Sequence, residues 1–114
     1  MPLITLINVG QSISGVLSAT SGRSVGCPTC YADLYQFTLN TTQVLAVTMN
    51  SNALDAFLQI LDLAGNVLLF DDDSGGGLNA RVAATFPPGT YRIEATSLLP
   101  GMSGSYTLTL APLP

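Results

Sequence analysis

Residues 81–96 read Arg-Val-Ala-Ala-Thr-Phe-Pro-Pro-Gly-Thr-Tyr-Arg-Ile-Glu-Ala-Thr, and this stretch decides the fold class. Before the Pro-Pro-Gly turn, Val82, Ala84 and Phe86 alternate with Arg, Ala and Thr, and the same alternation resumes at Tyr91 after the turn. Alternation places one face of a strand on a core and the other toward solvent, as in antiparallel sheets. The stretch therefore predicts two half-buried β-strands separated by a turn.

The same pattern continues upstream and downstream of this stretch. No window keeps apolar residues at helical spacing over three turns, whereas Gly, Pro, Asn and Asp clusters separate the alternating runs at sandwich-like intervals. We therefore expect an all-β fold, an antiparallel jelly-roll-like β-sandwich of about eight or nine strands. The strands are predicted near residues 3–8, 12–18, 33–39, 43–49, 56–62, 66–71, 80–86, 90–97 and 104–110.

The length of the chain, 114 residues, is enough for one domain with a sizeable core. We expect a single β-sandwich domain over residues 1–114, in which residues 1–9 form an N-terminal arm or donor strand. Apolar residues make up 47% of the chain and charged residues 9%. This composition excludes a disordered segment, which needs low hydrophobicity and high net charge.

Charged and catalytic side chains are scarce. Three arginines and seven acidic residues give a net charge of −4, and the chain has neither lysine nor histidine. Nucleic-acid binding by phosphate neutralisation is therefore not expected. Catalytic Ser–His–Asp and Ser–Lys units cannot be built, and no apolar run is long enough to span a membrane as a helix. We expect a protein that is not an enzyme.

The N-terminal residues lack both a basic segment and a long apolar segment, so they are not a signal peptide as written. Two interpretations remain, a cytoplasmic chain or a mature or excised piece of an exported precursor. Serine and threonine supply polarity where a cytoplasmic protein would use Lys and Glu, which favours the exported alternative. We expect an extracellular or cell-surface location, with the signal peptide already removed.

The two cysteines, Cys27 and Cys30, are separated only by Pro-Thr. A redox-active pair needs its first cysteine at a helix N-terminus, whereas a strand-like run follows this pair. A zinc site would lack half of its ligands, because the chain has no histidine and no second pair of this kind. We expect a local Cys27–Cys30 disulfide, and free thiols are the remaining interpretation.

Residues 56–70 read Ala-Phe-Leu-Gln-Ile-Leu-Asp-Leu-Ala-Gly-Asn-Val-Leu-Leu-Phe and break the alternation, because both faces of the expected hairpin are apolar. Such a strand is either central and covered or part of an interface. The chain has few charged residues to keep such an apolar surface soluble, so we expect a second copy to cover it. In this self-association the N-terminal segment would serve as a donor strand for a neighbouring copy. The self-association candidates are Leu3, Ile4, Leu6, Ile7, Phe57, Leu61, Leu68 and Phe70.

Six short motifs occur in order over roughly residues 10–111. They are Asp33-Leu-Tyr-Gln-Phe37, Asp55-Ala-Phe-Leu58, Gly65-Asn-Val67, Asp71-Asp-Asp-Ser-Gly-Gly-Gly-Leu-Asn79, Gly89-Thr-Tyr91 and Gly104-Ser-Tyr-Thr-Leu108. In this combination the chain resembles the bacterial pre-peptidase C-terminal domain family. The resemblance implies a β-sandwich of exported bacterial proteins that is removed during maturation, helps secretion or binds extracellular polymers. The collagen-binding domains of clostridial collagenases are similar in fold and bind calcium.

Acidic and amide side chains gather before and after a triple glycine, and two further aspartates precede aromatic strand residues. Closely spaced carboxylates on a turn can supply several of the oxygen ligands that Ca²⁺ takes. The EF-hand spacing is absent, and a turn in which Asp and Asn side chains accept hydrogen bonds from nearby backbone amides is the competing interpretation. Calcium is the one cofactor that the sequence suggests. Its candidate ligands are Asp33, Asp55, Asp71, Asp72, Asp73 and Asn79.

Glu94 is the only glutamate, and the alternation places it between Arg92 and Thr96 on the polar face of its strand. A carboxylate on an exposed strand face pairs with a cation on a neighbouring strand. We therefore expect a cross-strand partner such as Arg81 for Glu94 rather than a catalytic role.

The sequence is compatible with three functions. The first, narrowly favoured, is a structural, self-associating module, such as a filament or surface-assembly subunit, whose partners are copies of itself. The second is a module that binds an extracellular polymer, which an exposed aromatic row would indicate; only Tyr31, Phe57 and Phe70 fall outside the core pattern. The third is a secretion or maturation accessory domain of a secreted hydrolase.

Overall fold

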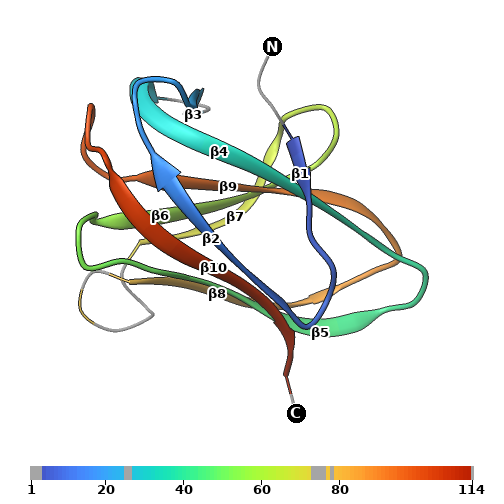
Figure 1. Ribbon diagram of the computed structural model, residues 1–114. Helices are drawn as coiled ribbons and strands as arrows, with labels where there is room; N and C mark the ends of the chain where they lie inside the picture. The colour runs from blue at the N-terminus through green and yellow to red at the C-terminus, as the bar shows by residue number, and fades with distance from the viewer. Residues whose placement is uncertain (1–3, 25–26, 73–76, 78, 114) are drawn as a thin grey trace.

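Two β-sheets packed face to face make up the computed structural model, which describes residues 4–24, 27–72, 77 and 79–113 (Figure 1). These residues form ten strands and no helix. The all-β sandwich of mainly antiparallel sheets therefore confirms the predicted fold class, with ten described strands where about eight or nine were predicted. In the described part of the chain, no helical segment has the length and apolar character that a membrane crossing requires.

The first sheet has six strands. Its order is β1 (Ile4–Leu6), β4 (Cys27–Leu39), β9 (Gly89–Ser97), β6 (Ala56–Leu61) and β7 (Val67–Asp71), and β3 (Gly22–Ser24) also pairs with β4. The pairing of β1 with β4 is parallel, and the other pairings of this sheet are antiparallel. Strand β7 lies at one edge of this sheet.

The second sheet has four antiparallel strands. Its order is β2 (Gln11–Leu17), β10 (Gly104–Pro112), β5 (Gln43–Asn50) and β8 (Ala80–Phe86). The Pro87-Pro88 turn carries the chain from β8 in this sheet to β9 in the other. The two strands predicted from residues 81–96 are therefore present, but they lie in different sheets and do not pair with each other.

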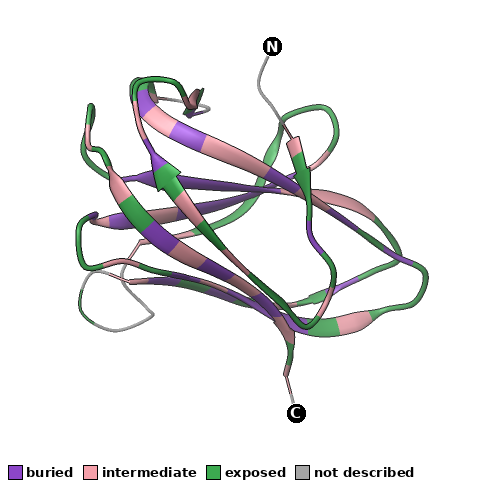
Figure 2. Ribbon diagram, viewed as in Figure 1, coloured by how far each residue is buried: buried purple, intermediate pink, exposed green. Residues whose placement is uncertain are grey.

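The core lies between the two sheets and consists of the inward-facing residue of each alternating pair (Figure 2). Phe37, Phe86 and Tyr91 form an aromatic cluster with ring centroids 5.2–5.8 Å apart. The Tyr91 hydroxyl donates a hydrogen bond to the Pro87 carbonyl at 2.7 Å. This contact ties the cluster to the turn where the chain changes sheets.

The segment before residue 33 differs from the sequence-based prediction. Strand β4 begins at Cys27, and β3 pairs with it, although the Gly- and Ser-rich sequence there shows no alternation. Cys27 and Cys30 are joined by a disulfide, as expected. Closing a loop this short contributes about 2 kcal/mol in the chain-entropy model. The disulfide therefore supports this segment locally rather than stabilising the whole sandwich.

Candidate functional site

The predicted calcium ligands do not all lie together, since Asp33 is distant from Asp71. Asp33 and Asp71 align on one row across the first sheet, with Ala95 and Leu58 between them. At about 4.8 Å per strand, their backbones are about 14 Å apart. Among the described residues, no three His, Cys, Asp or Glu side chains come close enough together to hold a metal ion.

Three of the six candidates already accept hydrogen bonds from protein groups. Asp33 accepts one from the Tyr106 hydroxyl, Asp71 from the Arg81 backbone N–H, and Asn79 from the Ser51 backbone N–H. The latter two contacts are the side chain–backbone bonds of the competing structural interpretation. The prediction for Asp73 falls outside the described residues, and Asp55 and Asp72 each lie at the end of a strand.

Calcium binding stays a prediction with a direct thermal test. A cation that binds only the folded state raises its stability by mass action. We expect a higher melting temperature in millimolar CaCl₂ than in chelator, and a smaller difference for the Asp72→Asn variant. Equal melting temperatures with CaCl₂ and with chelator would contradict calcium binding. Parallel scans in MgCl₂ separate a specific effect from charge screening.

Asp33, Tyr35 and Tyr106 form a hydrogen-bonded chain between the two sheets. The Tyr106 hydroxyl donates to Asp33 Oδ2 at 2.5 Å and lies 2.6 Å from the Tyr35 hydroxyl. Because a phenol has one proton to donate, Tyr35 donates to Tyr106. Burial, reinforced by these two hydrogen bonds, raises the pKa of Tyr106 well above its usual range, and burial also raises that of Tyr35. Both tyrosines therefore stay protonated, and these hydrogen bonds link the two sheets.

The expected ion pair between Glu94 and Arg81 is wrong. Glu94 lies in β9 of the first sheet, whereas Arg81 lies in β8 of the second and is exposed. Glu94 is only 1% exposed, and its carboxylate accepts hydrogen bonds from the Ser24 hydroxyl and, at 2.7 Å, from the Gln59 amide. Glu94 thus points to the outer face, as the alternation predicted, but that face is covered here.

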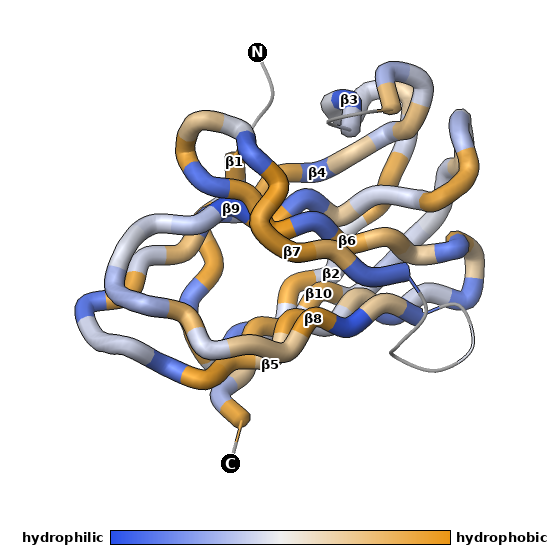
Figure 3. The backbone as a smooth tube through the Cα atoms, turned by 180° about the vertical axis from the view of Figure 1, so that it is seen from behind, coloured by the Kyte–Doolittle hydropathy of each residue, from blue (hydrophilic) through white to orange (hydrophobic). Residues whose placement is uncertain are grey.

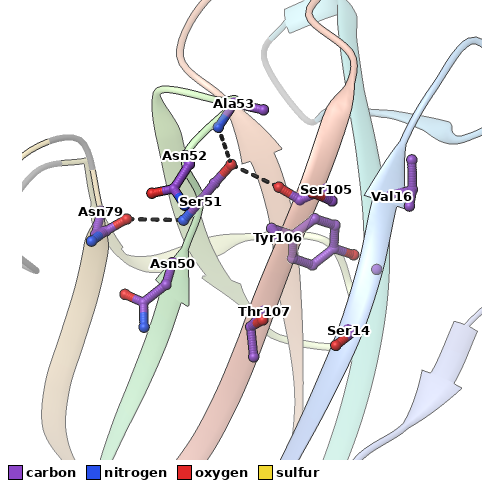
Figure 4. A pocket seen from close by; sticks show the side chains of 11 residues that line it. Ser14, Val16, Asn50, Ser51, Asn52, Ala53, Asn79, Ser105, Tyr106 and Thr107 are labelled. Atoms are coloured by element: carbon purple, nitrogen blue, oxygen red, sulfur yellow. Dashed lines mark hydrogen bonds between the residues drawn. The ribbon is translucent and has the colours of Figure 1, made fainter.

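A hollow of about 540 Å³ opens where β2, β10 and the turn after β5 meet (Figure 4). Ser51 organises its rim. Its hydroxyl donates to the Ser105 carbonyl at 2.7 Å and accepts from the backbone N–H groups of Ala53 and Leu54, while its own N–H donates to Asn79. None of the eleven lining residues is charged. The sequence carried no local signal of this hollow, because its walls come from four separate segments.

The predicted apolar surface is only partly present. Leu6, Leu68 and Phe70 are exposed, and Ile4 and Phe57 are half-buried. Ile7 and Leu61, by contrast, are buried within the chain, so their side chains are not available for contact with another molecule. Leu3 lies outside the described residues. Strand β1, expected as a donor for a neighbouring copy, pairs with β4 of its own chain.

Among the described residues, strand β7 carries the longest run of exposed apolar side chains, and Figure 3 shows this strand coloured as hydrophobic. All four residues from Val67 to Phe70 are exposed, by 37–68%. The strand pairs with β6 on one side, and Phe70 packs against Phe57 with ring centroids 6.1 Å apart. An apolar strand at a sheet edge is a site for pairing with another strand.

The chain is similar to known proteins in both sequence and fold. The family model described as bacterial pre-peptidase C-terminal domain matches residues 31–97. The pre-peptidase C-terminal domain of collagenase from Bacillus anthracis superposes with a TM-score of 0.75 at 15% identity, covering 96% of each chain. Aeromonas hydrophila PliG, a periplasmic inhibitor of g-type lysozyme, gives 0.64 at 10% identity, covering 94% of this chain and 95% of PliG. No curated protein matches the sequence.

Proposed function

The chain belongs to the bacterial pre-peptidase C-terminal domain family, and we propose that it is a non-catalytic module of an exported bacterial protein that self-associates through the edge strand β7. The family match supports the first part, since this domain is a non-catalytic module of secreted bacterial proteases. The periplasmic location of a protein with the same fold agrees with export. The observation that carries the second part is the exposure of Val67–Phe70 at a sheet edge.

A second copy is the occupant that best fits this edge. A two-fold axis perpendicular to the sheet brings two β7 strands together antiparallel, and residues opposite each other then point to the same side. One register places Leu68 opposite Leu68 of the second copy, with Val67 opposite Leu69. Every pair of these positions is apolar, so the contact removes hydrocarbon from water on both faces of the extended sheet.

Charge also shapes this association. Each copy carries a net charge of −4, and the acids Asp62 and Asp71 flank the apolar positions of β7. Two copies therefore repel each other at long range, and salt screens this repulsion over about 10 Å at 0.1 M. Contact through apolar side chains is not weakened by salt. Association through β7 should therefore strengthen as the salt concentration rises.

Substitution of Leu68 by lysine tests this proposal. Leu68→Lys places charges opposite each other at the two-fold axis, and like charges directly opposite are destabilising. Sedimentation velocity over a concentration series should show dimers or larger species for the unchanged chain, and at least tenfold weaker association for Leu68→Lys, the equivalent of about 1.4 kcal/mol.

The matched control is Leu99→Lys, an exposed leucine between β9 and β10. This variant adds the same charge away from β7 and should associate as the unchanged chain does. A monomeric chain at the highest concentration would contradict self-association. Equal weakening by both lysine variants would contradict an interface at β7, because Leu99 lies outside it.

The accessory-domain interpretation is the second candidate, and the superposition on a collagenase domain favours it. In that case β7 contacts a catalytic unit of the same parent protein rather than a second copy. The complete gene is the discriminating observation. An upstream hydrolase domain together with a monomeric isolated chain would support the accessory role over self-association.

A further inference from the structure

The hollow beside Ser51 lies on the four-stranded sheet, whereas β7 belongs to the six-stranded sheet. A ligand in this hollow is therefore independent of the proposed self-association. Its floor is a row across three strands, because Ser14 pairs with Thr107, and Thr107 pairs with Asn50. Neighbouring strands are about 4.8 Å apart, so these three polar side chains lie side by side. They point away from the core, since Tyr106 and Leu108 on either side of Thr107 belong to it.

The side chains of this row have no hydrogen-bond partner among the residues that the structure describes. The same holds for the side chain of Asn52. The side-chain oxygen of Asn79 accepts a hydrogen bond from the Ser51 N–H, whereas the Asn79 side-chain nitrogen has no partner among the described residues. A carboxamide offers an acceptor and two donors, and a hydroxyl offers both kinds of site. The hollow therefore presents several donors and acceptors toward one volume.

The chemistry of the lining selects the class of ligand. A charged ligand would find no opposite charge among the eleven lining residues. An apolar ligand would find only two aliphatic side chains, Val16 and Ala53, beside the buried ring of Tyr106. The volume of about 540 Å³ lies within the range of small-molecule sites. We propose that this hollow binds a neutral, polyhydroxylated carbohydrate through the amide and hydroxyl groups of Ser14, Asn50, Asn52 and Thr107.

The rim is built to hold these groups in place. Three segments meet at Ser51, because its hydroxyl bonds to β10 through Ser105 and its N–H bonds to Asn79 ahead of β8. A preorganised rim lowers the ordering cost of binding. The one aromatic ring of the lining, Tyr106, is 3% exposed, so stacking on a sugar face contributes little. Affinity then comes from hydrogen bonds alone, and the dissociation constant should be about 1 mM.

Chemical-shift titration of the ¹⁵N-labelled chain tests this site. The probes are the neutral trisaccharides cellotriose, maltotriose and triacetylchitotriose, with anionic trigalacturonate as a comparison of equal length. At least one neutral trisaccharide should shift the amides of residues 14–16, 50–53 and 105–107 at about millimolar concentration. No localised shift with any of the three at about 20 mM, or equally tight binding of trigalacturonate, would overturn the proposal.

Two isosteric variants separate the site from the rest of the sheet. Thr107→Val removes a hydroxyl from the floor and should weaken binding about fivefold, the equivalent of one net hydrogen bond. Thr85→Val makes the same change on β8, outside the hollow, and should leave binding unchanged. Equal binding by Thr107→Val and the unchanged chain would overturn the assignment. The Leu68→Lys variant should bind sugar normally, so failure of self-association does not affect this result.

Discussion

Replacing Gly15 with alanine should destabilise the fold by about 3 kcal/mol, an unusually large effect for one added methyl group. A Cβ at position 15 would lie 2.5 Å from Tyr106 Cζ and 2.9 Å from a second ring carbon. Alanine normally gains stability over glycine because it restricts the unfolded chain. The expected loss therefore has the opposite sign to the intrinsic effect of the substitution.

The tyrosine ring cannot move aside cheaply. Tyr106 is buried, and its hydroxyl is held by Asp33 on one side and Tyr35 on the other. Gly15 in β2 pairs directly with Tyr106 in β10. To make room for a methyl group at Gly15, the ring must therefore leave its hydrogen-bond partners, or β2 must separate from β10. Either movement breaks buried hydrogen bonds, and leaving buried polar groups without partners costs about 1–3 kcal/mol each.

Urea unfolding of Gly15→Ala measures this effect, with Ser14→Ala as the control. Ser14 is the neighbouring residue on the exposed face, and its loss should change the free energy of unfolding by less than about 0.5 kcal/mol. In a Tyr106→Leu background, which removes the ring, Gly15→Ala should cost little. A loss of the same size with and without the ring would contradict the clash, since coupling between contacting residues is then absent.

The relation between Gly15 and Tyr106 shows what the sequence could predict. The alternation around Tyr106 placed it in the core correctly, because a period of two is a local signal. Its hydrogen-bond partners and the glycine beneath it come from β4 and β2, and no local pattern records which strands pair. The strands other than β3 could thus be predicted one by one, whereas the register that joins them could not.

The hollow was invisible in the sequence for the same reason. Ser14, Asn50 and Thr107 are each an ordinary polar residue of the sequence. The alternation around Thr107 predicted a solvent-facing position, whereas Asn50 falls just after the strand predicted over residues 43–49, and the sequence predicted no particular face for Ser14. Only the pairings of β2 with β10 and of β10 with β5 bring them onto one row. The Cys27–Cys30 disulfide could be predicted because both partners lie within one short segment.

Glu94 illustrates where alternation misleads. The pattern gave the correct face of β9 but equated that face with solvent. Ser24 from β3 and Gln59 from β6 contact the carboxylate there, and β3 was not predicted at all. Whether the outer face of a sheet is covered depends on segments distant in sequence. The periodicity of one strand therefore fixes the direction of a side chain but not its surroundings.

Replacing Glu94 with alanine should cost about 3 kcal/mol of folding free energy. The change removes the acceptor for the Ser24 hydroxyl and the Gln59 amide, and all three residues are buried. Glu94→Gln keeps the shape and one acceptor oxygen but adds two donors. Its cost should therefore be smaller, about 1 kcal/mol. Urea unfolding of both variants gives the two free energies.

Arg81→Ala is the decisive companion to these variants. If Glu94 were paired with Arg81, the two alanine substitutions would remove the same interaction and cost similar amounts, and the double variant would cost no more than either. Since Arg81 is exposed on the other sheet, its loss should change stability by less than about 0.5 kcal/mol and should add to that of Glu94→Ala.

Ser24→Ala, in contrast, should be strongly non-additive with Glu94→Ala, because the two side chains share one hydrogen bond. A small effect of Glu94→Ala, equal to that of Arg81→Ala, would mean that the carboxylate is not held by Ser24 and Gln59.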